Sequence, residues 1–285
     1  MNTRKTIVDF RAMKQAGEKI AMLTAYDAGM AGFFASCGVD MLLVGDSVGM
    51  VVLGYDSTVP VTMAEMLHHA AAVRRGAPAA FVVGDLPFGS YQSGARDAIV
   101  NGTRFLKEAG CDAVKLEGGL EVCATVRAMV TAGIPVMGHI GLTPQTANQL
   151  GGYKVQGRDL ESARRLLREA RSLEEAGAFG MVLECVPEQL AALITEQIGI
   201  PTIGIGAGPS CDGQVLVSHD LLGMFEKFVP KFVKAYANLA PQIREGVSAY
   251  LADVRQGQFP GEEHSFVSEI DLAQLLTEES NELVK

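Results

Sequence analysis

Short apolar runs recur along the chain, separated by segments in which apolar residues have helical spacing. The runs predict eight strands, at residues 20–24, 40–45, 79–84, 112–117, 134–139, 179–184, 200–205 and 214–219. Several helical segments end at a glycine just before the next run, where a left-handed residue would terminate a helix: Gly38, Gly76, Gly110, Gly133, Gly177 and Gly199. Strands that alternate with helical segments indicate a parallel sheet.

Eight such strands favour the α/β fold of a closed (β/α)8 TIM barrel. Outer helices are clearest at residues 159–177, where an apolar stripe lies opposite charged positions, and at 187–199. The last strand is the weakest of the eight, so a doubly wound open sheet remains an alternative. We expect a single catalytic barrel domain with an N-terminal extension over residues 1–266. The tail is predicted to be helical from about residue 241, with an acidic extension over 267–285.

Composition limits the class of protein and its partners. A chain of 285 residues with 48% hydrophobic and 20% charged residues suits one globular domain. The net charge of -9 disfavours nucleic-acid backbones and anionic membrane surfaces as partners, and favours a small substrate. No apolar stretch reaches the roughly 18 residues that span a bilayer. Five scattered cysteines without a C-x-x-C pair predict reduced thiols and a cytoplasmic protein.

Polar and ionisable residues stand at the ends of several apolar runs. They are Asp46 and Ser47, Asp85, Lys115 and Glu117, His139, and Glu184. The C-terminal ends of parallel barrel strands meet at one face, so these residues are predicted to surround one cavity. Carboxylate oxygens suit Mg²⁺, which Asp46 and Asp85 are predicted to bind, with Glu117 reaching it directly or through water. Magnesium completes its shell with water and substrate oxygens, which implies a chelating substrate such as a 2-oxo acid.

The other residues at this face are candidates for the chemistry itself. Lys115 shares a side with Glu117 by strand alternation and can pair with a substrate carboxylate or an enolate oxygen. Glu184 ends the apolar run GMVLE, where partial burial suits a general base. His139 can donate a hydrogen bond to a substrate oxygen. The residues alone thus indicate metal-assisted proton abstraction next to a 2-oxo acid.

Structural alternatives exist for each of these residues. Asp46 could cap the following helix, and Asp85 could begin the DLPFG turn. Lys115 and Glu117 could form a simple ion pair, Glu184 could be held by backbone donors, and a single histidine at a strand end is often structural. These structural alternatives become less favoured than a functional site only if all the residues meet at one barrel face.

A series of motifs resembles the ketopantoate hydroxymethyltransferase family (3-methyl-2-oxobutanoate hydroxymethyltransferases). The resemblance extends from about residue 4 to residue 266 and rests on ordered segments that include TAYD, LLVGDSVGM, STVPVT, DLPFGSY, VKLEGG, GHIGLTPQ, GGYKVQGR, VLECVP and IGIGAG. It implies a (β/α)8 barrel of the phosphoenolpyruvate/pyruvate superfamily, commonly a homodecamer, that uses Mg²⁺. Departures at residues 92–94 and 209–211 and in the acidic tail lie away from the proposed chemistry.

The resemblance also implies residue roles and a reaction in pantothenate biosynthesis. Metal binding falls on Asp46 and Asp85 with Glu117 nearby, and Glu184 is the proton acceptor. Substrate contacts fall on Asp46, Ser47, Asp85 and Lys115, and His139 is a further candidate. In the implied mechanism 3-methyl-2-oxobutanoate chelates Mg²⁺, Glu184 removes the C3 proton, and the enolate carbon attacks the methylene group of 5,10-methylenetetrahydrofolate. The folate donor comes entirely from the resemblance.

Two other functions compete with this reading. A lyase or mutase of the same superfamily would share the metal and the oxo-acid site but would cleave or rearrange a bond. The sequence has no KKCGH-type loop to supply the catalytic cysteine of such an enzyme. A non-catalytic binding or assembly protein on a barrel scaffold would be indifferent to replacement of Glu184.

Overall fold

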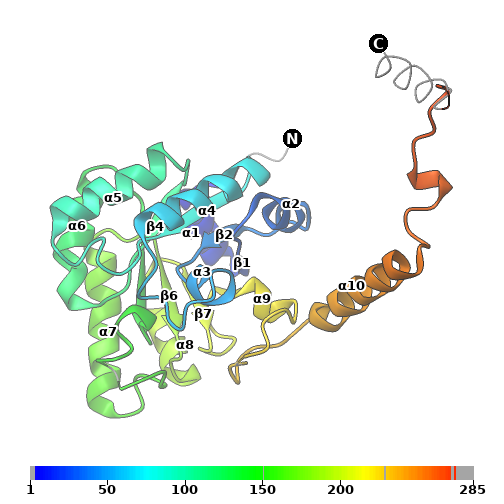
Figure 1. Cartoon of the computed structure of the whole chain (residues 1–285). Coiled ribbons are helices and arrows are strands. Elements are labelled where there is room, and N and C mark those ends of the chain that lie inside the picture. Colours follow the sequence, from blue (N-terminus) through cyan, green and yellow to red (C-terminus); the bar gives the residue numbers. More distant parts are fainter. Residues whose placement is uncertain (1–3, 150, 228, 271–272, 274–285) are drawn as a thin grey trace. The chain divides into compact units, whose positions relative to one another are not determined.

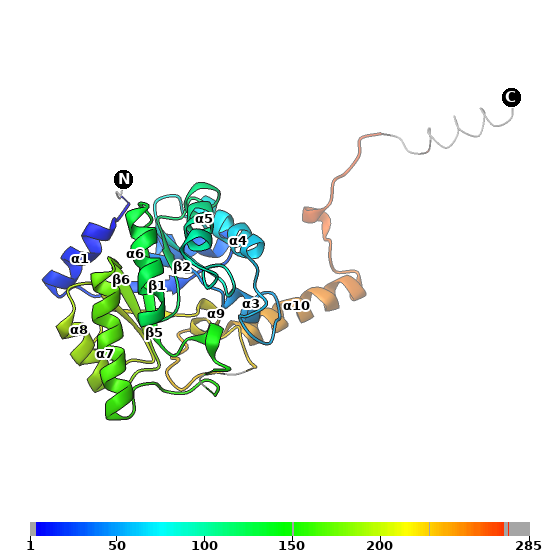
Figure 2. The same cartoon turned by 90° about the vertical axis from the view of Figure 1, so that its left-hand side faces the viewer.

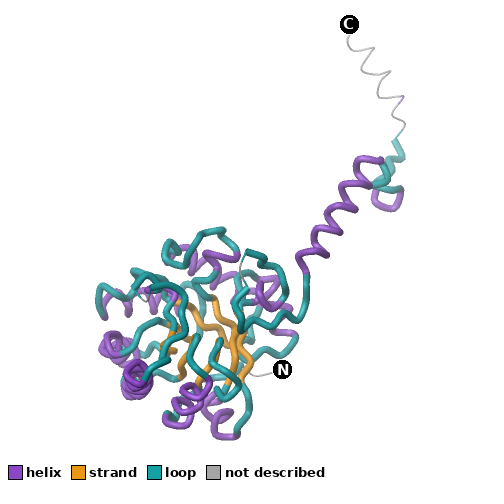
Figure 3. Tube along the Cα trace, turned by 90° about the horizontal axis from the view of Figure 1, so that it is seen from below, coloured by secondary structure: helices purple, strands orange, loops and turns teal. Residues whose placement is uncertain are grey.

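The computed structural model describes residues 4–149, 151–227, 229–270 and 273. Eight parallel strands form a closed barrel in sequence order, and β1 pairs with β8 to complete it. Figure 3 shows the strands at the centre with helices around them. The predicted (β/α)8 barrel is therefore confirmed, and the open sheet is excluded. The strands are β1 (Ile20–Thr24), β2 (Met41–Val44), β3 (Phe81–Asp85), β4 (Ala113–Lys115), β5 (Val136–Gly141), β6 (Gly180–Glu184), β7 (Thr202–Ile205) and β8 (Gly213–Leu216).

Helices follow the strands and cover the outside of the barrel, as both Figure 1 and Figure 2 show. The two helices predicted most clearly are present as α7 and α8. The α-helices are α1 (Ile7–Ala16), α2 (Ala28–Ser36), α3 (Val48–Val51), α4 (Met63–Gly76), α5 (Ala95–Lys107), α6 (Cys123–Thr131), α7 (Leu160–Glu175), α8 (Glu188–Gln197), α9 (Ser218–Leu221) and α10 (Leu239–Gln256). Short 3-10 helices are η1 (Leu120–Val122), η2 (Pro144–Thr146) and η3 (Glu262–His264).

The glycines predicted to end helices divide into two groups. Those with positive φ have the predicted left-handed conformation, and they are Gly38, Gly110, Gly133 and Gly177. The prediction is wrong for Gly76 and Gly199, which do not have positive φ. At Gly76 the reason for glycine is a close approach, because an added Cβ would lie 2.0 Å from the carbonyl oxygen of Ala28. Gly76 thus allows α4 to pack directly on the start of α2.

The N-terminal extension forms α1 and closes the N-terminal end of the barrel. Thr6 and Asp9 form a capping box at the start of this helix. The side chain of each residue accepts a hydrogen bond from the backbone N–H of the other. Phe10 is fully buried, and its ring lies 5.0 Å from the ring of Phe81 at the start of β3. Burial of one such ring stabilises the fold by about 2–3 kcal/mol. The N-terminal end of the barrel is thereby sealed with apolar side chains.

The opposite end of the barrel carries the long connections. Residues 45–62 join β2 to α4, and residues 142–159 join β5 to α7. Strand register aligns Asp85 with Lys115 across β3 and β4, and Gly141 with Glu184 across β5 and β6. Polar side chains from neighbouring strands therefore reach the same end, where barrel enzymes place their active sites.

The chain forms two compact units, residues 1–237 and 238–285. In the second unit α10 ends at Gly257 in a left-handed conformation, and the ring of Tyr250 lies 5.7 Å from that of Phe259. A helix was predicted from about residue 241, and α10 confirms it. The proposed boundary at residue 266 stays a prediction, and most of the acidic extension over 267–285 lies outside the described residues. Within the described parts of the chain, no helix combines the length and apolar character needed to cross a membrane.

Candidate active site

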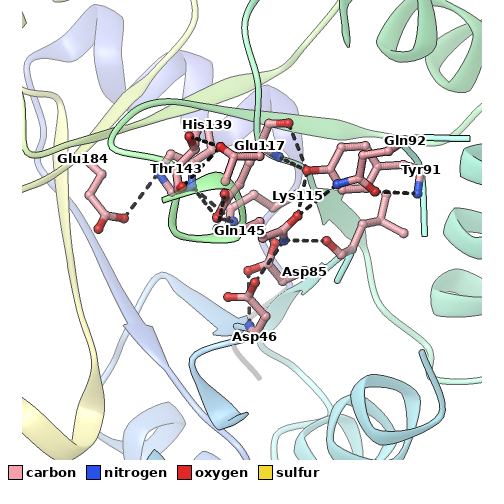
Figure 4. A network of polar contacts seen from close by, with 12 residues as sticks. Asp46, Asp85, Tyr91, Gln92, Lys115, Glu117, His139, Thr143, Gln145 and Glu184 are labelled. Atoms are coloured by element: carbon pink, nitrogen blue, oxygen red, sulfur yellow. Dashed lines mark hydrogen bonds and ion pairs between the residues drawn. The ribbon is translucent and has the colours of Figure 1, made fainter. Parts of the chain in front are cut away.

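All seven residues predicted for the site line one cavity of about 400 Å³ at the C-terminal end of the barrel: Asp46, Ser47, Asp85, Lys115, Glu117, His139 and Glu184. Figure 4 shows the charged ones directed toward one another from successive strands. The ionisable groups other than Glu184 are at most 5% exposed, and the Glu184 side chain is 15% exposed. The predicted convergence is therefore present, while the chemical roles of these residues stay predictions.

Lys115 lies at the centre of the charged cluster. Its Nζ is 2.7 Å from Oδ1 of Asp85, 3.2 Å from Nδ1 of His139 and 3.8 Å from Oε1 of Glu117. The main partner of Lys115 is thus Asp85, so a simple Lys115–Glu117 pair does not describe the site. Burial lowers the pKa of Lys115, but the nearby carboxylates more than offset that effect and the net change is upward. Lys115 is therefore a fixed positive charge at neutral pH.

Asp46 faces Asp85 from the neighbouring strand. The backbone N–H of Asp46 donates to Oδ2 of Asp85 at 3.3 Å, and Oδ2 of Asp46 accepts from Nε2 of Gln145 at 2.9 Å. Burial, reinforced by the charge of Asp85, raises the pKa of Asp46 to about 7. The alternative that Asp46 caps the following helix is wrong. The N-cap residue of α3 is Ser47, and no side chain forms a capping hydrogen bond at the start of α3.

The donor set fits a hard divalent cation supported by few protein ligands. Among the described residues, no group of three His, Cys, Asp or Glu side chains is placed to hold a metal ion by itself. Asp46 and Asp85 do provide two facing buried carboxylates with too few cations to balance them. Glu117 is engaged elsewhere, since its Oε2 accepts from the backbone N–H of Gln145 at 3.0 Å. Two carboxylates fit Mg²⁺, which commonly takes its remaining oxygens from water and substrate.

His139 links the lysine to the candidate base. Its Nε2 lies 3.3 Å from Oε2 of Glu184, and its Nδ1 faces Nζ of Lys115. Burial, aided by the charge of Lys115, lowers the pKa of His139, so the ring is neutral at physiological pH. A lysine can only donate, so Nδ1 must accept and the ring proton is on Nε2. The Nε2–H of His139 therefore lies near Glu184 without forming a hydrogen bond, and it is available to donate to a ligand.

The backbone around Glu184 is closely constrained. An added Cβ at Gly141 would lie 2.2 Å from the carbonyl oxygen of Glu184, so only glycine fits beside it on β5. Cys185, the next residue, has a backbone φ of 50°, which is uncommon for residues other than glycine and asparagine. Burial raises the pKa of the Cys185 thiol to about 12, so it is a neutral cavity wall and no nucleophile.

Two residues that organise the acids were not predicted from the sequence. Gln145 is 3% exposed and donates through Nε2 to Asp46 and to the carbonyl oxygen of Leu86, both at 2.9 Å. The hydroxyl of Tyr91 donates to Oε1 of Gln145 at 2.8 Å, which fixes the orientation of the amide. Gln145 follows β5 in the long connection, and only its position in GLTPQ could have pointed to it. Gln145 thus contacts two acids that follow different strands, Asp46 through its side-chain amide and Glu117 through its backbone N–H.

The hydroxyl of Ser47 forms a further contact that the sequence did not predict. Its Oγ lies 2.8 Å from the hydroxyl of Tyr26, a buried residue that follows β1. Burial raises the pKa of Tyr26, and the charges of Asp220 and Asp46 act in the same direction. Tyr26 is therefore a neutral hydroxyl that lies near carboxylates on two sides of the cavity.

Comparison with known proteins now identifies the family. The family model for ketopantoate hydroxymethyltransferase matches residues 4–262. The chain belongs to this family. A relative from Desulfotalea psychrophila named 3-methyl-2-oxobutanoate hydroxymethyltransferase is 66% identical over 96% of this chain and 98% of its own length. One of the same name from Carboxydothermus hydrogenoformans is 61% identical over 92% of this chain and 95% of its own length.

Solved structures with the same fold are more distant from this hydroxymethyltransferase-family chain. A 2,3-dimethylmalate lyase of the PEP mutase/isocitrate lyase superfamily aligns with a TM-score of 0.57 and 18% identity, over 99% of this chain and 98% of that one. A phosphonopyruvate hydrolase, solved with oxalate and Mg²⁺, aligns with a TM-score of 0.58 and 14% identity, over 98% of both chains. At such low identity these similarities establish the barrel fold alone.

Proposed function

We propose that this protein transfers a hydroxymethyl group to 3-methyl-2-oxobutanoate to give ketopantoate in pantothenate biosynthesis. The observation that carries the proposal is the cavity itself, in a chain that matches the ketopantoate hydroxymethyltransferase family over nearly its whole length. One side of the cavity has facing carboxylates at Asp46 and Asp85, and the other has Glu184 beside a neutral histidine. These are the groups that metal-assisted removal of a proton next to a keto group requires.

In this proposal Mg²⁺ is held by Asp46 and Asp85, with Glu117 in contact through water or directly. A bound Mg²⁺ would polarise the keto group of the oxo acid and make its C3 proton more acidic. Lys115 contributes a fixed positive charge for the substrate carboxylate or the enolate oxygen. The backbone and hydroxyl of Ser47 lie at the cavity wall beside Asp46 and can bind a carboxylate oxygen.

Glu184 is the proposed general base. Its carboxylate accepts the C3 proton, the C–H electron pair becomes the C2–C3 double bond, and the charge moves to the keto oxygen. The Nε2–H of His139 lies 3.3 Å from Oε2 of Glu184 and helps to orient the carboxylate. His139 also lies within reach of a substrate oxygen, so it can exchange one acceptor for the other as charge develops.

The proposed one-carbon donor is 5,10-methylenetetrahydrofolate. Neither the donor nor the oxo acid contains the oxygen of the new hydroxyl group, so the balanced reaction consumes one water and releases tetrahydrofolate with ketopantoate. The enolate carbon supplies the electron pair of the new C–C bond, and water supplies that of the new C–O bond. The two C–N bonds of the methylene bridge break in exchange, and the two folate nitrogens take up the C3 proton and one proton from water.

Hydrogen–deuterium exchange at C3 of 3-methyl-2-oxobutanoate tests the proposal by NMR in D₂O. We expect wild-type protein to catalyse exchange with Mg²⁺ and to lose that activity in EDTA. Glu184→Gln should abolish exchange, whereas Asp97→Asn, an exposed acid on α5, should leave it unchanged. Full exchange in metal-free protein would overturn the role of Asp46 and Asp85, and full exchange in Glu184→Gln would overturn the base. A superfamily lyase, the alternative function, would cleave the substrate without such exchange.

We further propose a cytoplasmic homo-oligomer, with a decamer implied by the family resemblance. All five cysteines are free thiols, which supports a reducing compartment. In α10 the exposed apolar residues Ile243, Val247, Tyr250 and Val254 recur at helical spacing, which supports contact with further copies of the chain. Light scattering should give a mass that is a multiple of the 30.2 kDa protomer, and a monomeric mass would contradict the proposal.

A further inference from the structure

The cavity has a second side that the proton-transfer chemistry does not use. Around β8 and the chain that follows it, most of the lining is apolar or aromatic, with Val217, Phe225, Pro230 and Phe232, and Lys231 also reaches the cavity there. Phe232 is held in place by close packing, because an added Cβ at Gly206 would lie 2.7 Å from its ring. In the proposed function Asp46, Asp85 and Lys115 serve the metal and the oxo acid, and none of these apolar residues has a role.

Asp220 is the acidic residue of this apolar side. It lies in α9 directly after β8, lines the cavity and is about half buried. No hydrogen bond or ion pair joins its carboxylate to another described residue, and burial alone raises its pKa to about 6. A half-buried carboxylate of this kind is hydrated where it faces the open cavity. A ligand that displaces that water must supply hydrogen-bond donors in its place, because the carboxylate would otherwise be buried without a partner.

The charges of the cavity show which ligand suits this position. Tyr26 lies close enough to Asp46 and to Asp220 for both carboxylates to contribute to its raised pKa. Lys115 is on the Asp85 side, so the anionic oxo acid is attracted there and repelled by Asp220. A ligand for Asp220 must instead carry N–H donors and a flat apolar face to match Phe225.

We propose that Asp220 binds the pteridine ring of the folate donor, with the ring against the aromatic wall formed by Phe225. This assignment rests on the proposed function. A pteridine has a 2-amino group and an adjacent ring N–H, which point the same way and match the two oxygens of one carboxylate. The pyrimidine half of the reduced ring, which carries these donors, is planar and suits an apolar, aromatic surface. Asp220 is thus assigned to donor recognition and plays no part in removing the C3 proton.

Equilibrium dialysis with tetrahydrofolate tests the assignment. Asp220→Asn keeps the shape of the side chain but replaces one acceptor with a donor that would face the ligand's own N–H groups. We expect the dissociation constant for tetrahydrofolate to rise about 10- to 100-fold. C3 exchange of the oxo acid without folate should stay within about twofold, because that half-reaction does not involve the pteridine site. Asp97→Asn is the matched control, and a thermal melt establishes that each variant is folded.

A second variant makes the test independent of Asp220. Phe225→Leu keeps an apolar side chain of similar size but removes the ring, and should weaken tetrahydrofolate binding about 2- to 10-fold without affecting C3 exchange. Unchanged tetrahydrofolate binding in Asp220→Asn would overturn the assignment, and so would an equal loss of C3 exchange and folate binding. If the wild type transfers the one-carbon unit normally in those cases, the proposed function stands and only the assignment fails. A wild type that does not transfer the unit at all would remove both.

Discussion

Replacement of Asp46 by asparagine should stabilise the metal-free protein while it removes metal binding. Asp46 is 5% exposed, and its burial next to Asp85 raises its pKa from 3.8 to about 7. Between these pH values the folded chain holds a proton that the unfolded chain has released, so this group's contribution to stability is lost as the pH rises. Above pH 7 the loss reaches an upper limit of about 4 kcal/mol.

The expected gain is smaller than this limit, because local relaxation and water reduce the cost of a buried charge. Asparagine keeps an oxygen that can accept from Nε2 of Gln145, and its amide can donate to Asp85. We therefore expect Asp46→Asn to raise the free energy of unfolding by about 2 kcal/mol at pH 8 and by about half as much at pH 5. The same substitution removes one of the two proposed metal ligands.

Urea denaturation in EDTA at pH 5 and pH 8 measures the first effect, with Asp97→Asn as the matched exposed control. The second is measured by adding Mg²⁺ and the oxo acid at pH 8, which should stabilise the wild type by mass action and leave Asp46→Asn unchanged. The reasoning is refuted if metal-free Asp46→Asn is less stable than the wild type at pH 8. An equal gain at both pH values would also refute it, because the effect would then not arise from ionisation of Asp46.

Three further substitutions test other parts of the structure. Glu184→Gln should lower kcat about 10²- to 10⁴-fold with little change in the KM for the oxo acid, and an unchanged kcat would exclude it as the base. Gln145→Leu should weaken Mg²⁺ activation about 10- to 100-fold, measured by metal titration of activity, and a shift below about twofold would contradict its positioning role. Gly76→Ala should destabilise the barrel by about 1–3 kcal/mol in urea, because its Cβ would overlap the carbonyl oxygen of Ala28. Gly246→Ala in α10, where nothing lies within 4 Å, should leave the barrel transition unchanged, and equal effects would contradict the packing argument.

The barrel could be predicted from the sequence because each strand is a short apolar run with polar segments on both sides. The strand ends were less predictable. The run at 112–117 gives only Ala113–Lys115 as β4, since Gly118 has a φ of 130° and turns the chain to form a bridge with His139. The predicted strand 214–219 ends at Leu216, and its last residues instead begin α9. Asp220 directly follows this predicted strand, as Asp46 and Asp85 follow theirs, but it was not among the predicted site residues.

The candidate site was predictable in its acids and base but not in the groups that hold them. Carboxylates at strand ends can be predicted to share one site, because the parallel strands of a barrel place their C-terminal ends together. Gln145 lies in a connection whose path depends on tertiary packing, and its contact with Asp46 spans 99 positions. Nor could the sequence show that Lys115 would pair with Asp85 on the adjacent strand, because that pairing depends on the register between β3 and β4.

The imbalance of charge in the cavity connects the stability of the folded protein to the proposed function. Asp46, Asp85, Glu117 and Glu184 surround a single buried lysine, and His139 is held neutral. Packing alone would favour protonation of some of these acids, which is the direction of the pKa changes at Asp46 and Glu117. A divalent cation compensates the same charges without protonation and keeps the carboxylates available as ligands. Under the proposed function, burial of these acids together lowers the stability of the metal-free protein and raises its affinity for a cation, so Asp46→Asn should change the two quantities in opposite directions.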